Sequence, residues 1–202
     1  MSEPLFRTLH ALRIKGFAKA ESVAELAGLD VEIVCAHLGQ LLQSGDAKFR
    51  EPRSLWQLTA QGRLAHDVAL TDDLEGSDKQ VLADTYQPFL SLNERFKELC
   101  GDWQLRAGVA NDHADAGYDA AVVRRLVDLN ADAQDVLVAL SDVVPRFSGY
   151  APRLAQTCQR VVDGETTMLT GVMCGSYHDV WMELHEDLIL TQKIDRVREG
   201  SF

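Results

Sequence analysis

The sequence predicts a mainly α-helical protein with one small β-hairpin near its N-terminus and a bundle of long helices after it. Two observations lead to this prediction. Apolar residues recur every three or four positions over most of the chain, as they do in amphipathic helices. Only residues 47–58 contain the short, bounded runs typical of strands. The 202 residues, 46% of them hydrophobic and 25% charged, suffice for one large or two modest globular domains.

The formal charge is divided unevenly along the chain. Residues 1–70 contain eight basic and eight acidic side chains, whereas residues 71–202 contain twelve and twenty-three and carry the whole net charge of -11. The acidic stretch 71–78, rich in small residues, lies at this change and is typical of a linker. We therefore expect two domains, 1–72 and 79–202. Because the acidic domain repels phosphate, any nucleic-acid contact is expected in the N-terminal domain.

Membrane and secretory signals are missing from the sequence. The longest apolar stretch, Val136–Leu140, is far shorter than the roughly 20 residues that a membrane span needs. The first residues show no basic cluster followed by an apolar run, so no signal peptide is expected. The four cysteines stand far apart with no CxxC pair, which favours reduced thiols. We therefore predict a cytoplasmic protein without a membrane partner.

The N-terminal domain is expected to fold as short helices followed by a hairpin and a further helix. The predicted order is helices 4–14, 22–27 and 31–44, strands 47–50 and 55–58, and a helix capped by Thr59 that runs through Gly62, Leu64 and Val68. Asp30 is positioned to cap the third helix. The apolar stripe of that helix is expected at Val34, Leu38, Leu41 and Leu42.

This order of elements is that of a winged helix-turn-helix, and three passages resemble the MarR-like winged-helix transcription regulators. They are the turn Ser22–Leu29, the helix Val34–Gly45, and the passage Trp56–Arg63, which is similar to the LTxxGR sequence of that family. The resemblance covers roughly a third of the chain. It implies a regulator that binds double-stranded DNA, and a homodimer formed through helices outside the wing.

The resemblance also implies which residues contact DNA. The helix 31–44 would enter the major groove, and the hairpin would act as the wing that grips the backbone. Side chains expected to face the bases are Ile33, Ala36, His37 and Gln40, with Glu32 on the same face. Wing contacts are expected from Lys48, Arg50, Arg53 and Ser54, and further phosphate contacts from Arg63, Lys15 and Lys19.

The sequence departs from that family in its charge. No lysine or arginine occurs between Ala20 and Ala47, and Glu32 lies on the expected reading face. Neutralisation of phosphates supplies most non-specific affinity for DNA, so the basic residues of the hairpin would have to provide it. Two alternatives stay open. The hairpin charges contact DNA, or they protect a solvated sheet edge and the domain is a protein-interaction module that keeps the winged fold.

The C-terminal domain is predicted to be a bundle of four amphipathic helices. The first is expected to begin at Pro88, the second spans Tyr118–Val144, with Val136 and Val143 in its apolar seam, the third carries the stripe Phe147–Val161, and the fourth begins at Ser176. Seams with this spacing also suit a dimer interface. The domain is therefore expected to serve dimerisation or effector sensing.

The last predicted helix carries several histidine and acidic side chains close together. Its two histidines, His178 and His185, are seven residues apart, about 10 Å along a helix, which is too far to share one metal ion. No metal site is expected. Its four carboxylates are Asp179, Glu183, Glu186 and Asp187. They either form a solvated acidic face or pair with arginines of other helices, the candidates being Arg124, Arg125, Arg153 and Arg160.

Two interpretations of the aromatic residues in this domain stay open. They belong to the core, or they line a cavity for a small-molecule effector. The candidate pocket residues are Trp103, Tyr150, Tyr177, His178, Trp181, Met182 and His185. Catalytic motifs are not found: the sequence has no GxSxG, no HExxH and no phosphate-binding glycine loop. We therefore expect neither an enzyme nor a cofactor.

Overall fold

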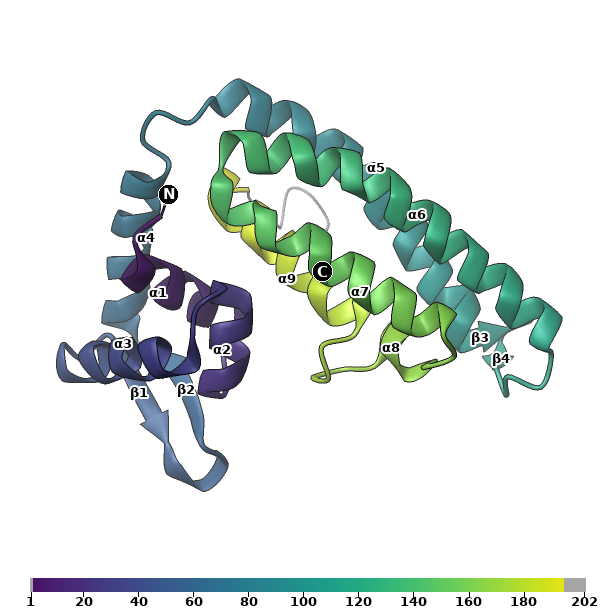
Figure 1. Cartoon of the computed structure of the whole chain (residues 1–202), viewed down its shortest axis with the longest axis horizontal. Coiled ribbons are helices and arrows are strands. Elements are labelled where there is room, and N and C mark those ends of the chain that lie inside the picture. The colour runs from purple at the N-terminus through teal and green to yellow at the C-terminus, as the bar shows by residue number, and fades with distance from the viewer. Residues whose placement is uncertain (1, 195–202) are drawn as a thin grey trace. The chain divides into compact units, whose positions relative to one another are not determined.

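The computed structural model describes residues 2–194, which are mainly helical with two small antiparallel sheets of two strands each (Figure 1). The predicted helical class and the hairpin at 47–58 are confirmed. Contacts divide the described chain into two compact units. Unit 1 comprises residues up to Ser77 together with 189–194, and unit 2 comprises Asp78–Leu188. Each unit is described by itself below.

Unit 1 contains four helices and a hairpin among its described residues up to Ser77. In chain order they are α1 (Pro4–Lys15), α2 (Ala20–Ala27), α3 (Val31–Gln43), β1 (Ala47–Arg50), the 3-10 turn η1 (Glu51–Arg53), β2 (Leu55–Leu58) and α4 (Ala60–Asp73). The strands pair in register from Ala47 opposite Leu58 to Arg50 opposite Leu55. Ala18 and Trp56 exchange two backbone hydrogen bonds of 2.8 and 3.1 Å, so the chain between α1 and α2 extends the hairpin.

Local sequence explains where these elements begin and end. Gly28 ends α2 in the left-handed conformation, with φ of 60°, which glycine adopts without strain. The Thr59 hydroxyl accepts a hydrogen bond of 3.0 Å from the Gly62 amide, as predicted for the cap of α4. Gly62 also lies so close to the Asp46 carbonyl that an added Cβ would stand 1.9 Å from that oxygen. A glycine is therefore required where α4 crosses the start of β1.

The core of unit 1 lies between α1, α2, α3 and the base of the hairpin. Its fully buried members are Ala11, Leu12, Val23, Val34 and Leu38. The prediction that Leu42 belongs to the buried stripe of α3 is wrong, because this side chain is 46% exposed. Leu42 follows the buried Leu41 by one position, about 100° around the helix, and this turns it away from the core.

Unit 2 is built from long helices. It contains α5 (Lys79–Gln104), the short strands β3 (Leu105–Arg106) and β4 (Val109–Ala110), α6 (Ala116–Val143), η2 (Pro145–Gly149), α7 (Tyr150–Val162), α8 (Thr167–Thr170) and most of α9 (Tyr177–Gln192). In Figure 1, α5 and α6 run side by side along their length. The acidic Asp128, Asp135 and Asp142 are exposed on α6 at intervals of seven residues.

Pro88 lies inside α5 and not at its start, so this prediction is wrong. The helix begins nine residues earlier, where the Asp78 carboxylate accepts hydrogen bonds from the amides of Gln80 and Val81. Buried Leu82, Thr85 and Tyr86 hold the first turns against the core. These contacts and the cap outweigh the backbone hydrogen bond that proline removes within a helix.

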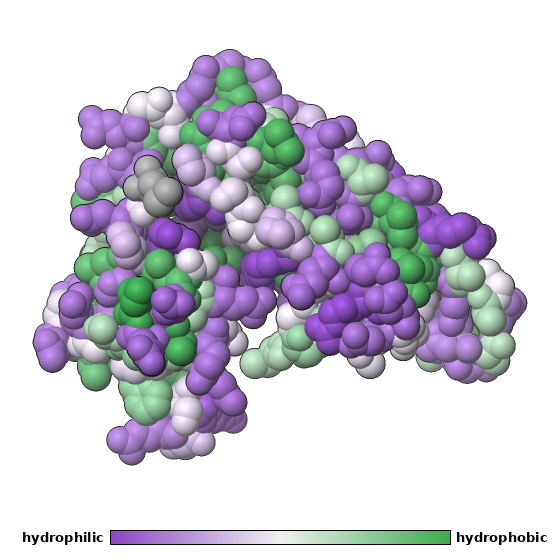
Figure 2. All heavy atoms as spheres, viewed as in Figure 1, coloured by the Kyte–Doolittle hydropathy of each residue, from purple (hydrophilic) through white to green (hydrophobic). Residues whose placement is uncertain are grey.

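The core of unit 2 consists of aliphatic seams and aromatic rings. Leu126, Leu129 and Leu140 of α6 are buried as the spacing predicts, but the seam passes through Leu137 and leaves Val136 and Val143 half-buried. Hydrophilic residues cover most of the face seen in Figure 2, with smaller apolar areas between them. Among the described residues, no helix combines the length and apolar character that crossing a membrane requires.

Candidate nucleic-acid interface

The solvent-exposed face of α3 carries three of the four predicted base-reading residues. Val34, Leu38 and Leu41 fix the buried face of the helix. Ile33, Ala36 and Gln40 are exposed away from it, as is Glu32. A helix with one face packed on α1 and α2 and the opposite face open can present side chains to a partner.

His37 does not belong to this exposed face, although the sequence placed it there. Its Nδ1 atom lies 2.9 Å from the Oγ1 atom of Thr8, a fully buried residue of α1. The side chain is half-buried, and its hydrogen bond joins α3 to α1. The reason is its position: His37 lies three residues after the buried Val34 and four before the buried Leu41, and so lies beside the core stripe.

The exposed face of α3 has no positive charge of its own. The segment from Ala20 to Ala47, which contains all of α2 and α3, holds no lysine or arginine. Glu32 is exposed in the first turn of α3. Phosphate binding at this helix would therefore depend on the partial positive charge of its N-terminus and on cations from the hairpin.

The hairpin supplies those cations on one of its faces. Lys48 and Arg50 alternate along β1 with Phe49, so their side chains share the face opposite to that of Phe49 and Trp56. The side chain of Lys48 is exposed and makes no hydrogen bond or ion pair within residues 2–194, and the same is true of the Arg53 side chain at the tip. We call Lys48, Arg50 and the neighbouring Phe17 the basic face of the hairpin.

Arg50 is held in place on the basic face. Its Nε–H group donates to the Oε1 atom of Gln57 at 3.1 Å, and its guanidinium carbon lies 5.7 Å from the centre of the Phe17 ring. The residue is exposed, and both terminal NH₂ groups are without a hydrogen-bond partner within residues 2–194. An arginine positioned in this way loses little conformational entropy when it binds a phosphate through two parallel hydrogen bonds.

Sequence reasoning missed Phe17 and Gln57. Gln57 had a usable signal, since it lies opposite Lys48 in the paired strands and thus diagonal to Arg50. Phe17 had no such signal, because its position depends on the pairing of Ala18 with Trp56, and no local sequence pattern predicts that pairing.

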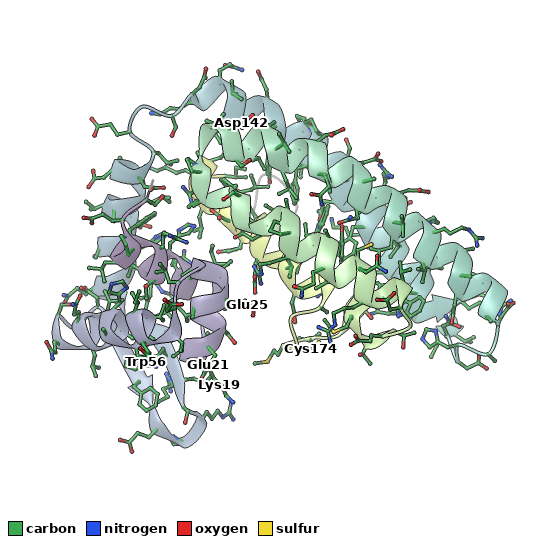
Figure 3. All side chains as sticks on the ribbon, in the orientation of Figure 1. Lys19, Glu21, Glu25, Trp56, Asp142 and Cys174 are labelled. Atoms are coloured by element: carbon green, nitrogen blue, oxygen red, sulfur yellow. The ribbon has the colours of Figure 1, made fainter. Side chains whose placement is uncertain are left out.

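The inner face of the hairpin is aromatic. Phe49 and Trp56 are directly opposite each other, and their ring centroids are 4.9 Å apart. Figure 3 shows Trp56 on the hairpin, where its side chain packs against the core of unit 1. This pair stiffens the base of the hairpin. Ser54, at the tip, has a left-handed backbone with φ of 52° and closes the turn after η1.

The remaining predicted phosphate contacts are spread over unit 1. Arg63 is exposed in the first turn of α4, and its side chain makes no hydrogen bond or ion pair within the described chain. Lys15 is half-buried at the end of α1. Lys19 is exposed directly before α2 and is labelled in Figure 3.

The candidate pocket residues of unit 2 lie in its core. Tyr177 and Trp181 are fully buried, and the Trp181 ring lies 5.4 Å from Phe89 and 5.0 Å from Phe96, measured between centroids. The Trp181 indole donates to the Oδ1 atom of Asn93 at 2.9 Å. Of the two interpretations of these aromatics, the packing favours the core.

Two of the other candidate pocket residues lie against the same two phenylalanine rings as Trp181. His178 and His185 contact the Phe96 and Phe89 rings, with centroids 6.2 and 5.1 Å apart. Trp103 packs on His113 at 4.6 Å. Tyr150 donates to Asp187, and Met182 is 38% exposed. Four of the seven candidates, Tyr177, His178, Trp181 and His185, thus gather at the Phe89 and Phe96 rings, whereas Trp103, Tyr150 and Met182 have other surroundings.

Two of the four carboxylates of α9, those of Glu183 and Asp187, are paired with arginines, so the four do not form a bare solvated face. Arg153 of α7 contacts Glu183 at 2.7 Å, and Arg146 of η2 contacts Asp187 at 3.2 Å, with both members of each pair buried or nearly so. Asp187 also accepts from Tyr150 at 3.1 Å. Burial and the negative charge of Asp187 raise the pKa of Tyr150 well above its usual value, so it stays a neutral donor.

In the part of the chain that the structure describes, the other arginines considered for these pairs, Arg124, Arg125 and Arg160, make no ion pair with α9. Arg125 pairs with Asp102 across α5 and α6, and Arg160 pairs with Glu165. Asp179 has a different role, because its carboxylate accepts hydrogen bonds from the amides of Met173, Cys174 and Gly175 and fixes the loop before α9. Figure 3 labels Cys174 on that loop.

Within residues 2–194, no group of three or more histidine, cysteine or acidic side chains is arranged to hold a metal ion. The comparisons with known proteins identify no relative. No family model matches the sequence, and no match was found among the curated proteins or among the solved structures.

Proposed function

We propose that unit 1 binds double-stranded DNA as a winged helix-turn-helix and that the chain is a transcriptional regulator. The observation that carries this proposal is the basic face of the hairpin, where Arg50 is held by Gln57 and Phe17 beside the unpaired Lys48. The MarR-like order of elements supports it, since α2 and α3 would form the helix-turn-helix and the hairpin would be the wing.

In this mechanism the hairpin provides the affinity and α3 provides a limited reading of sequence. Lys48, Arg50 and Arg53 would neutralise backbone phosphates, and Gln40 would pair with an adenine edge in the major groove. Ile33 and Ala36 would make apolar contacts, for example with thymine methyl groups. Because the affinity would come from these cation–phosphate contacts, we expect binding that weakens as the salt concentration rises, and the repulsion between Glu32 and phosphate keeps the affinity modest at low salt.

Selection of fragmented genomic DNA on the purified full chain, followed by anisotropy over a salt series, tests this function. We expect one enriched fragment. Lys48→Glu and Arg53→Glu should each weaken binding and lower the salt slope by about one for each lost phosphate contact. The control is Lys97→Glu on α5, an exposed lysine of unit 2. No enrichment at low salt, or equal effects of all three variants, would contradict the proposal.

One observation favours a second function. The exposed face of α3 combines Ile33 and Ala36 with Glu32 and lacks any cation. This composition suits a protein partner at least as well as a nucleic acid. Under this alternative, Ile33→Asp would abolish capture of a specific protein while Lys48→Glu would leave it unchanged, and no DNA fragment would be enriched.

A further inference from the structure

The face of α4 that points away from the core of unit 1 is apolar. Leu64 and Val68 are 68% and 65% exposed, the highest values among the large hydrophobic residues described in unit 1. They are four residues apart and so lie one turn apart on the same side of the helix. The opposite side holds the buried His66 and Leu70. Two aliphatic side chains are thus presented together to solvent.

Two further exposed residues continue this surface. Ala60 precedes Leu64 by one turn, and Thr71 follows Val68 by nearly one turn. The Thr71 hydroxyl donates to the Asp67 carbonyl of its own helix at 3.0 Å, so it does not compete for an external partner. We call Ala60, Leu64, Val68 and Thr71 the α4 face.

One flank of the α4 face carries opposite charges. Arg63 and Asp67 are exposed and four residues apart, a spacing at which they could pair within the helix. They form no such ion pair: the Arg63 side chain has no hydrogen bond or ion pair within the described chain, and the Oδ1 atom of Asp67 lies 3.4 Å from the Nδ1 atom of His66. The Arg63 guanidinium and the second carboxylate oxygen of Asp67, whose side chain is 64% exposed, therefore remain available to an external partner on the same flank.

We propose that the α4 face binds the α4 face of a second copy of this chain, with the two helices antiparallel. A two-fold axis perpendicular to both helices places each flank opposite the same flank of the other copy. Leu64 then packs on Val68 of the second copy. Arg63 lies within reach of Asp67 of the second copy, and symmetry repeats this ion pair.

The charges select both the partner and its direction. In a parallel arrangement the Arg63 flank would meet the other flank of the second helix, where Gln61 and Asp72 lie, and the two reciprocal pairs would be lost. One helix face of this length buries less than the roughly 1,000 Å² of a stable interface, so the dimer is weak and depends on concentration. The inference assigns Arg63 to this contact and does not rest on DNA binding.

Exchange of charges between two variants tests the pairing. Sedimentation equilibrium of the full chain should show a monomer–dimer equilibrium. Arg63→Asp alone and Asp67→Arg alone each create two like-charge contacts, so each should raise the dimer dissociation constant about tenfold or more. An equimolar mixture should form a heterodimer as tight as the original, because both ion pairs return, one of them with its polarity reversed. A purely local effect of either substitution on folding cannot produce this recovery.

The apolar part of the surface is tested separately. Leu64→Lys should also raise the dissociation constant at least about tenfold, whereas Val138→Lys, at an exposed valine of α6, should not change it. Thermal unfolding checks that each variant is folded. A chain that is monomeric at every concentration overturns the proposal. So does a dimer insensitive to Leu64→Lys, or a mixture that stays monomeric, since a different surface or terminal segment would then form the contact.

Discussion

At the scale of single residues, the least expected feature is a pair of buried histidines. The Nδ1 atom of His10 on α1 and the Nε2 atom of His66 on α4 are 2.9 Å apart, and the two rings are stacked. One nitrogen must donate and the other accept. Desolvation and the proximity of His10 lower the pKa of His66 to about 4, and Arg13 acts in the same direction against the opposing effect of Asp67. His66 is therefore neutral at physiological pH.

This pair predicts that unit 1 loses stability in mild acid. The pKa of His66 is below the ordinary value of 6.5 in the folded state, so the unfolded chain takes up the proton first. The contribution of neutral His66 to the free energy of unfolding is complete above pH 6.5, declines as the pH falls, and is lost below pH 4. The free energy of unfolding therefore changes by about 3 kcal/mol over this range. Urea unfolding between pH 7.5 and 4.5 should show this dependence, and His66→Gln should flatten it. An NMR titration of His66 near pH 6.5 would contradict the assignment.

Two glycines give opposite predictions for the same substitution. Gly62→Ala would place a Cβ atom 1.9 Å from the Asp46 carbonyl oxygen, whereas an added Cβ at Gly39 of α3 meets nothing within 4 Å. We expect Gly62→Ala to lower the free energy of unfolding by about 2–4 kcal/mol. Gly39→Ala should raise it by about 0.5–1 kcal/mol through helix propensity. Chemical denaturation measures both, and equal effects would show that α4 does not approach β1 so closely.

At the scale of elements, the buried ion pairs predict how α9 is attached to α7 and η2. Asp187→Asn leaves Arg146 buried beside a neutral partner, and the loss of one member of a buried pair costs about 3–5 kcal/mol. Asp132→Asn breaks the exposed pair with Arg95 on α6 and α5 and should cost less than about 1 kcal/mol. Urea unfolding of unit 2 compares the two. A small effect at Asp187 would mean that solvent reaches this pair.

The helices and the hairpin could be predicted because their signals are local. The spacing of Val34, Leu38 and Leu41 marks one face of α3, and the Thr59–Gly62 cap marks the start of α4. The start of α5 was misplaced because Pro88 is a strong local signal. Tertiary burial of Leu82 overrode it.

The parts of the candidate site that sequence reasoning missed depend on contacts between distant residues. His37 turns toward Thr8, 29 positions away, and Phe17 meets Arg50 across the hairpin. The pairing of the α9 carboxylates with arginines could be anticipated only as an alternative. The spacing of apolar residues predicts which face of a helix is buried, but it does not predict which residues pack against that face.

At the scale of the whole molecule, the two units differ in charge. Unit 2 carries nine basic and eighteen acidic residues, while the hairpin of unit 1 carries three basic residues and one acidic residue. For a DNA-binding chain this asymmetry has a consequence for kinetics. The negative potential of unit 2 opposes the approach of a polyanion, and it acts over about a Debye length, roughly 10 Å at 0.1 M salt.

Neutralising the acidic row on α6 should therefore speed association with DNA without touching the proposed interface. The triple variant Asp128→Asn, Asp135→Asn and Asp142→Asn changes exposed residues and removes three of the negative charges, so the net charge of -11 becomes less negative by three. We expect an association rate about two- to fivefold higher at 50 mM salt, and no difference at 0.5 M, where salt screens the field within a short distance.

The matched control replaces the same three residues by glutamate, which keeps the charge and should keep the association rate. Stopped-flow anisotropy measures all three proteins. An increase that persists at high salt would have to come from a changed contact and not from the long-range field.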